Sequence, residues 1–126
     1  MHKAVRQLTY ALVAIGILAN VYFMLTNGEP DKLWWWTGEL VFFVWTAIPF
    51  VGIATATKCL SKGLTSAFIL FITSIIITFG GVYALVETFI VHLDPQSGII
   101  FIFLPFYQLV HVAVGVGLAL LTKKLL

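Results

Sequence analysis

Apolar residues run in four long stretches along the chain, and short polar segments separate these stretches. The apolar stretches cover residues 8–26, 33–57, 64–91 and 98–122. A helix needs about 20 consecutive apolar residues to cross a hydrocarbon core about 30 Å thick. The pattern therefore predicts an all-α integral membrane protein with four transmembrane helices.

The polar segments between the stretches are too short to hold another domain, so we expect a single domain over residues 1–126. Asp94 is a good helix cap and Pro95 suits the first helical position, which predicts a fourth helix over residues 95–122. Only a short turn then remains between the third and fourth helices, so these two must be antiparallel. The predicted architecture is an up-down-up-down bundle of four transmembrane helices.

The composition narrows the class of protein. Hydrophobic residues make up 61% of the chain and charged residues only 10%, and the mean hydropathy is +1.08. Soluble domains carry about 25% charged residues. A soluble enzyme, a nucleic-acid-binding domain and a disordered tail are therefore excluded. The single cysteine, Cys59, also excludes an intramolecular disulfide.

The distribution of basic residues predicts the orientation in the membrane. With four spans both termini lie on one side, and that side carries six basic residues: Lys3, Arg6, Lys58, Lys62, Lys123 and Lys124. The opposite side carries only Lys32. Basic residues favour the cytoplasmic side, so we expect both termini in the cytoplasm. The first apolar stretch is too long for a signal peptide, and we interpret it as a retained span.

The short loops are typical of a protein of the bacterial inner membrane. The chain ends in Lys123-Lys124-Leu125-Leu126, which also fits the dilysine pattern of endoplasmic-reticulum retrieval signals. The endoplasmic reticulum membrane is therefore the second expectation.

Polar residues within the apolar stretches are the candidate functional residues, because such residues are costly in hydrocarbon and usually face the bundle interior. Asn20, Glu39 and Glu87 each lie four to six residues from the outer end of a predicted helix. At a rise of about 1.5 Å per residue they fall at similar depths, and we expect one polar layer.

The fourth helix carries Tyr107, Gln108 and His111, whose spacing puts them on roughly one face. Together with the polar layer they form a candidate intramembrane polar site. One interpretation is a track for protons or cations that ends at His111. The other interpretation is structural, with His111 bound to Tyr107 or to a backbone carbonyl, and we favour it.

Prolines and tryptophans mark further positions. Pro49 and Pro105 lie inside predicted helices, where each removes a backbone hydrogen bond, so we expect kinks. Trp34, Trp35 and Trp36 lie where the second helix enters the membrane. Indole rings favour the membrane–water interface, which indicates an anchor, and a site for a protein partner is the alternative.

No nucleophile–base pair, phosphate loop or dinucleotide motif is present, and the three histidines lack metal-ligand spacing. We therefore expect no enzyme activity, no cofactor and no metal. A membrane enzyme or a haem protein with His111 as axial ligand is the least favoured hypothesis.

We expect a non-catalytic polytopic membrane protein that binds a partner in or beside the lipid bilayer, such as an accessory subunit or an immunity-type protein. The alternative is a small proton- or cation-linked channel or transporter, formed by a parallel homo-oligomer. Its polar track consists of Asn20, Glu39, Glu87, Gln108 and His111.

Overall fold

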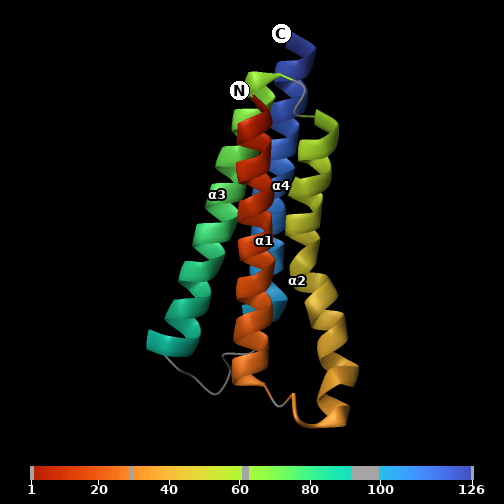
Figure 1. The fold of residues 1–126 in the computed structure, drawn as a ribbon, viewed down its shortest axis with the longest axis vertical. Coiled ribbons are helices and arrows are strands. Elements are labelled where there is room, and N and C mark those ends of the chain that lie inside the picture. Colours follow the sequence, from red (N-terminus) through yellow and green to blue (C-terminus); the bar gives the residue numbers. More distant parts are fainter. Residues whose placement is uncertain (1, 29, 61–62, 92–99, 126) are drawn as a thin grey trace.

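The computed structural model describes residues 2–28, 30–60, 63–91 and 100–125, and nearly all of them are helical. The helices are α1 (His2–Asn27), α2 (Leu33–Leu60), α3 (Leu64–Val86) and α4 (Ile100–Leu125). A short π-helix, η1 (Glu87–Val91), continues α3. The helices run alternately up and down, and both termini lie at the same end of the bundle (Figure 1). The predicted all-α class is confirmed.

Helix boundaries differ from the apolar stretches at the start of α1 and at the ends of α2 and α4, which each run three residues further. α1 begins at His2 and so includes Lys3 and Arg6, because Lys and Arg are good helix formers even outside an apolar run. α2 continues to Leu60, one turn beyond the predicted end. The predicted helix start at Asp94 and Pro95 lies outside the described residues, and α4 is described from Ile100.

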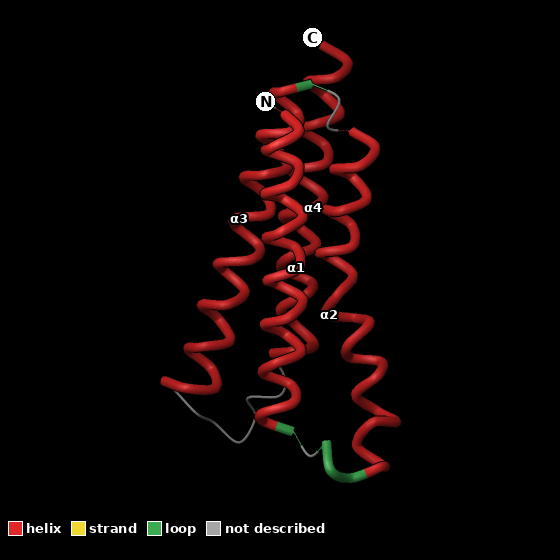
Figure 2. The backbone as a smooth tube through the Cα atoms, in the orientation of Figure 1, coloured by secondary structure: helices red, strands yellow, loops and turns green. Residues whose placement is uncertain are grey.

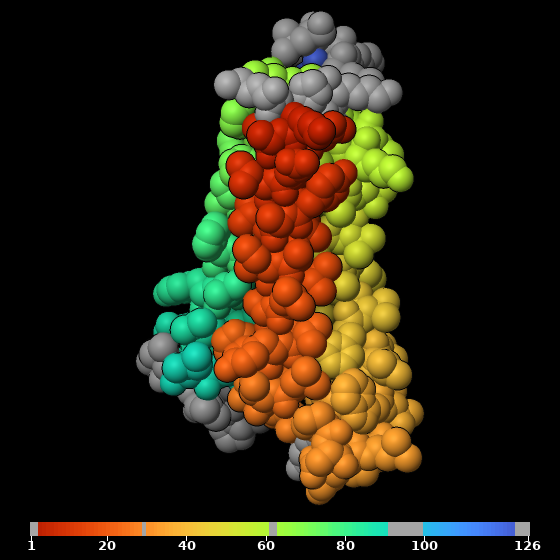
Figure 3. All heavy atoms as spheres, in the orientation of Figure 1, coloured from red at the N-terminus to blue at the C-terminus, as the bar shows by residue number. Residues whose placement is uncertain are grey.

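All four helices are long and apolar enough to cross a membrane, which is consistent with a multi-pass membrane protein. Their outward side chains are largely aliphatic or aromatic: Leu33, for example, is 88% exposed, and Leu18 and Val41 are also exposed. A water-soluble bundle would have mostly polar side chains at such outward positions. Figure 3 shows one outer face of the bundle, on which α1 lies between α3 and α2.

The helices are not arranged around the bundle in their order along the chain. α1 packs mainly against α2 and α3, and α4 packs mainly against α2 and α3, so α2 and α3 lie across a diagonal. Small residues permit the close approach of α1 and α3: Ser74 and Thr78 are buried, and Thr78 Oγ1 donates a hydrogen bond to the carbonyl of Leu12 at 3.2 Å.

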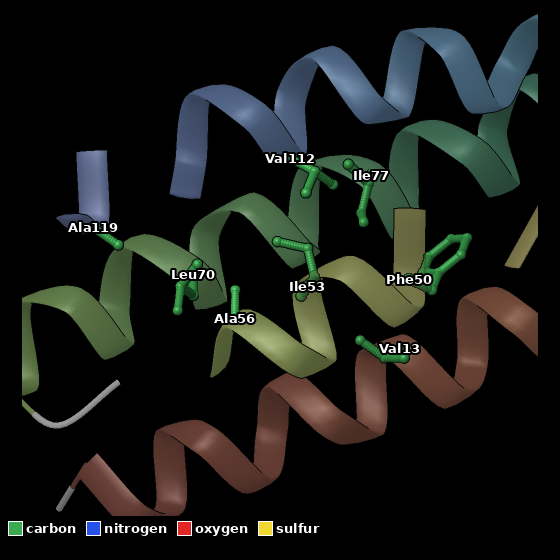
Figure 4. Packing of buried hydrophobic residues seen from close by; sticks show 8 residues of the cluster. All are labelled: Val13, Phe50, Ile53, Ala56, Leu70, Ile77, Val112 and Ala119. Atoms are coloured by element: carbon green, nitrogen blue, oxygen red, sulfur yellow. The ribbon is translucent and has the colours of Figure 1, made fainter. Parts of the chain in front are cut away.

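Two apolar clusters form the core. The first takes residues from all four helices, and Figure 4 shows their side chains in the space between the helices: Val13, Phe50, Ile53, Ala56, Leu70, Ile77, Val112 and Ala119. The second lies around the rings of Phe23, Phe89 and Phe101. Phe89 stacks on both other rings, with centroid distances of 5.9 and 5.3 Å, and thereby ties η1 to α1 and α4.

Both expected proline positions are buried inside continuous helices. α2, which contains Pro49, changes direction partway along its length (Figure 2). Pro105 leaves the carbonyl of Phe101 without its helical donor. One residue further on, the carbonyl of Ile102 accepts a hydrogen bond from Trp45 Nε1 at 3.0 Å, which joins α2 to α4.

Candidate functional site

The three adjacent tryptophans occupy three different environments. Trp34 is 66% exposed, and its role as an interface anchor stays a prediction. Trp35 is buried, and its indole fills the space where a side chain at position 28 would lie, so Gly28 is required there. Trp36 Nε1 donates a hydrogen bond to the carbonyl of Pro30 at 2.8 Å. Trp35 and Trp36 therefore hold the connection between α1 and α2.

The predicted polar layer is split between the bundle interior and its periphery. Asn20 is buried, whereas Glu39 and Glu87 are partly exposed. Glu87 is the first residue of η1, and its backbone N–H donates hydrogen bonds to the carbonyls of Tyr83 and Ala84. Neither glutamate lines the two spaces described below.

Asn20 and Gln108 are both buried in the bundle interior. Both line a small space together with Thr78, Gly81 and Phe50. The space leaves no volume for the centre of a water molecule. Because a buried water needs such volume as well as polar partners, this part of the interior is dry.

Gln108 is held tightly against α3. Its Nε2 donates a hydrogen bond to the carbonyl of Ile77 at 3.0 Å. The same nitrogen lies 2.6 Å from where a β-carbon at position 81 would be, so a side chain there would displace the Gln108 amide. Gln108 Oε1 is buried and has no hydrogen-bond partner in the part of the chain that the structure describes. An unpaired buried acceptor of this kind costs about 1–3 kcal/mol.

Tyr107, Gln108 and His111 do not share one face, in contrast to the expectation from their spacing. Gln108 is 2% exposed and points into the bundle, whereas Tyr107 is 62% exposed. Adjacent residues are about 100° apart around a helix, so Gln108 can point inward while Tyr107 points outward. His111 lies on the outer side with Tyr107, one turn away.

His111 is bound to the backbone of its own helix. Its Nδ1 lies 3.0 Å from the carbonyl oxygen of Tyr107, and the two rings are in contact with a centroid distance of 4.5 Å. A carbonyl only accepts, so Nδ1 is the donor and carries the hydrogen. In the neutral ring Nε2 is then an acceptor. No hydrogen-bond partner for Nε2 is found among the described residues.

A groove with a volume of about 410 Å³ lies on the outer surface between α3 and α4. His111 lines this groove, and the other lining side chains are almost all aliphatic: Ile69, Ile72, Thr73, Ile76, Val110, Val114, Gly115 and Leu118. Thr73 lies against Gly115, where a β-carbon would clash with its hydroxyl and methyl groups. The two small residues bring the helices together beneath the groove.

Two tyrosines extend the same surface beyond the groove. Tyr83 lies seven residues after Ile76, and Tyr107 lies four residues before His111, so each continues its helix face. Tyr83 is 69% exposed, and Tyr107 is similarly exposed. We refer to the groove residues together with Tyr83 and Tyr107 as the α3–α4 face.

Of the polar groups on the α3–α4 face, His111 lies farthest from the helix ends, whereas Tyr83 is three residues before the end of α3. His111 is eleven residues from each end of the apolar segment Ile100–Thr122, which is about 16 Å along the helix. The sequence pattern did not reveal this groove, although the spacing of Ile69, Ile72 and Ile76 marks one helix face. Its partner face on α4 becomes recognisable only when the pairing of α3 with α4 is known.

No known protein family matches the chain, and no curated protein or solved structure is detectably similar to it. Within residues 2–28, 30–60, 63–91 and 100–125, no group of three His, Cys, Asp or Glu side chains is placed to hold a metal ion.

Proposed function

We propose that the protein is a non-catalytic multi-pass membrane protein that binds a partner protein within the bilayer through the α3–α4 face. The observation that carries this proposal is the position of Tyr83, Tyr107 and His111 on an outer surface. Lipid tails provide no hydrogen-bonding groups, so polar side chains on transmembrane helices usually face protein. A partner protein that covers the α3–α4 face gives these groups a suitable environment.

An accessory subunit or an immunity-type protein, which blocks a membrane-active toxin, is the kind of molecule that fits this proposal. Both act by occupying a surface of another membrane protein and need no reacting groups of their own. The distribution of Lys and Arg supports an orientation with both termini in the cytoplasm. We propose the bacterial inner membrane as its location, with the endoplasmic reticulum as the alternative.

Site-specific photocrosslinking in the membranes of the native host tests the proposal. A photoreactive residue is placed at Val114 in the groove and, as a control, at Val44 on α2; both valines are exposed. We expect one discrete crosslinked protein from Val114 and only lipid adducts from Val44. Equal adducts at the two positions, or none at Val114, would contradict a partner at the α3–α4 face.

A channel or transporter is the second candidate, and one observation favours it. Gln108 Oε1 is buried without a partner in the described structure, close to Asn20, as a polar group on an ion path can be. Against this, the same space is dry, and the groove that contains His111 is a separate one on the outer surface. The geometry of a single chain therefore supports the channel less than the partner protein.

Flux through liposomes separates the two candidates. If the protein conducts protons through His111, a pH-sensitive dye inside the vesicles reports a flux that disappears in His111→Asn. The partner-binding function predicts no flux above that of empty vesicles. A flux that is lost in a well-folded His111→Asn variant would place the channel first.

A further inference from the structure

We propose that the partner inserts one transmembrane helix along the α3–α4 face, and that this helix carries a hydroxyl or amide donor which binds Nε2 of His111. The inference rests on the proposed function and specifies its partner. The donor belongs to a Ser, Thr, Asn or Gln side chain near the middle of the partner helix, and aliphatic side chains on either side of it fill the groove.

The hydrogen-bonding state of His111 determines the chemistry of the partner. Nδ1 donates to the carbonyl of Tyr107, which leaves Nε2 of the neutral ring as an acceptor. The surrounding groove is lined by aliphatic side chains, so an unpaired acceptor there is unfavourable. A donor from the partner satisfies Nε2, whereas a carboxylate or carbonyl does not.

The depth of His111 favours a helix over a lipid as the occupant. The ring lies about 16 Å from each end of the apolar segment of α4, which is the middle of a hydrocarbon core about 30 Å thick. A lipid keeps its polar group at the membrane surface. A transmembrane helix, in contrast, can place a Ser, Thr, Asn or Gln side chain at any depth.

The shape of the face also suits a helix. The groove extends from Ile69 to Ile76, a length of about 10 Å or two helical turns. Side chains at positions i, i+4 and i+7 of a partner helix cover that length. From Ile69 to Tyr83 the face is about 21 Å long, which requires an elongated partner rather than a compact molecule.

A second copy of this chain is a poor complement to the same face. Two copies inserted in the same direction around a two-fold axis bring equal depths together, so each groove would meet the other groove and leave a hollow. The outer surfaces of α1 and α2 near the middle of the membrane present Ile15, Leu18 and Val44. These aliphatic side chains carry no donor for His111.

A synthetic helix of defined sequence tests the inference. The protein is labelled with a fluorescence donor on Cys59, its single cysteine, which is exposed at the end of α2. The probes are Lys-flanked oligoleucine helices of about 20 residues that carry an energy acceptor. One probe has a central Thr and the other is all Leu. Energy transfer in phospholipid vesicles, measured against probe density, gives the relative affinity.

We expect the Thr probe to bind the parent protein about threefold more tightly than the Leu probe, which is the average effect of one hydrogen bond between membrane helices. His111→Phe keeps an aromatic ring but has no acceptor, so it should bind both probes equally. His111→Gln restores an acceptor and should recover part of the preference. Circular dichroism and thermal melting check that the variants are folded.

The possible failures are distinguishable. Equal binding of the two probes by the parent protein would overturn the proposed hydrogen bond to His111. If the Val114→Trp variant, whose indole fills the groove, then binds both probes more weakly than the parent, the groove is still a helix-binding site. Equal binding by parent and Val114→Trp would overturn the helix site. Energy transfer between two labelled populations of the protein, lost in Val114→Trp, would assign the groove to a second copy and overturn the inference. Crosslinking at Val114 in host membranes remains the separate test of the proposed function.

Discussion

The side-chain amide of Gln108 on α4 lies where any residue other than glycine at position 81 on α3 would put its β-carbon. The contact brings the two helices close enough for Gln108 to reach the carbonyl of Ile77. The adjacent Gly80 has open space around its own β-carbon position. The two neighbouring glycines are thus a matched pair: a β-carbon would meet Gln108 at position 81 and open space at position 80.

Gly81→Ala should lower the stability of the bundle by about 1–3 kcal/mol, because the added methyl group displaces the Gln108 amide. Gly80→Ala should be neutral or slightly stabilising, because alanine favours a helix more than glycine does. Thermal melting in mild detergent, followed by circular dichroism, measures both. Similar melting temperatures for the two variants would show that α3 and α4 do not approach closely at Gly81.

Gln108→Leu should be at least as stable as the parent. The substitution loses the hydrogen bond to Ile77, but it also removes the buried Oε1, whose missing partner costs about 1–3 kcal/mol. Gln108→Ala, by comparison, leaves a cavity and should destabilise the protein. A clear drop in the melting temperature of Gln108→Leu would indicate that Oε1 has a stabilising partner.

Gly115→Ala should also destabilise the bundle, because the new methyl group meets the Thr73 side chain on α3. Gly117→Ala is the control, since the space around Gly117 is open. In the double variant, Thr73→Ala removes the hydroxyl and methyl groups that clash, and should restore part of the lost stability. If the stability lost in the double variant equals the sum of the losses in the two single variants, the two positions are not in direct contact.

Trp45→Phe should cost about 1 kcal/mol, because it removes the hydrogen bond to the carbonyl of Ile102 and keeps an aromatic ring beside Phe106. Trp34→Phe changes an exposed ring and serves as the control. The two variants are compared by thermal melting. Equal stability would mean that the bond between α2 and α4 contributes little.

The orientation in the membrane is tested with cysteine probes in a Cys59→Ser background. Probes at Asp31 and Ser97 should react with an impermeant thiol reagent added outside intact cells, because the sequence predicts both in loops on the side poor in basic residues. A probe at Ser61 should react only after the cells are opened. Labelling of Ser61 from outside would reverse the proposed orientation.

The four long helices were predictable because the length of an apolar stretch is a local property of the sequence. The hydrogen bond of His111 was also within reach, since a carbonyl four residues back is available in any helix. The sequence did not predict that Gln108 points inward and Tyr107 outward, because this depends on which side of α4 packs against α3. The diagonal placement of α2 and α3 was unpredictable for the same reason. Short links limit the distance between the ends of consecutive helices, but side-chain packing decides which helices are neighbours.

The contacts at Gly81 and Gly115 have a consequence for the sliding of α3 along α4. Each glycine accepts a larger side chain from the opposite helix, Gln108 at one level and Thr73 at the other. The two levels are eight residues apart on α3 and seven apart on α4, or about 10–12 Å. A shift of the hairpin by a single turn would break both contacts at once and drive Gln108 and Thr73 against larger neighbours. The two contacts together therefore favour one register of α3 against α4, and this register sets the width and depth of the groove.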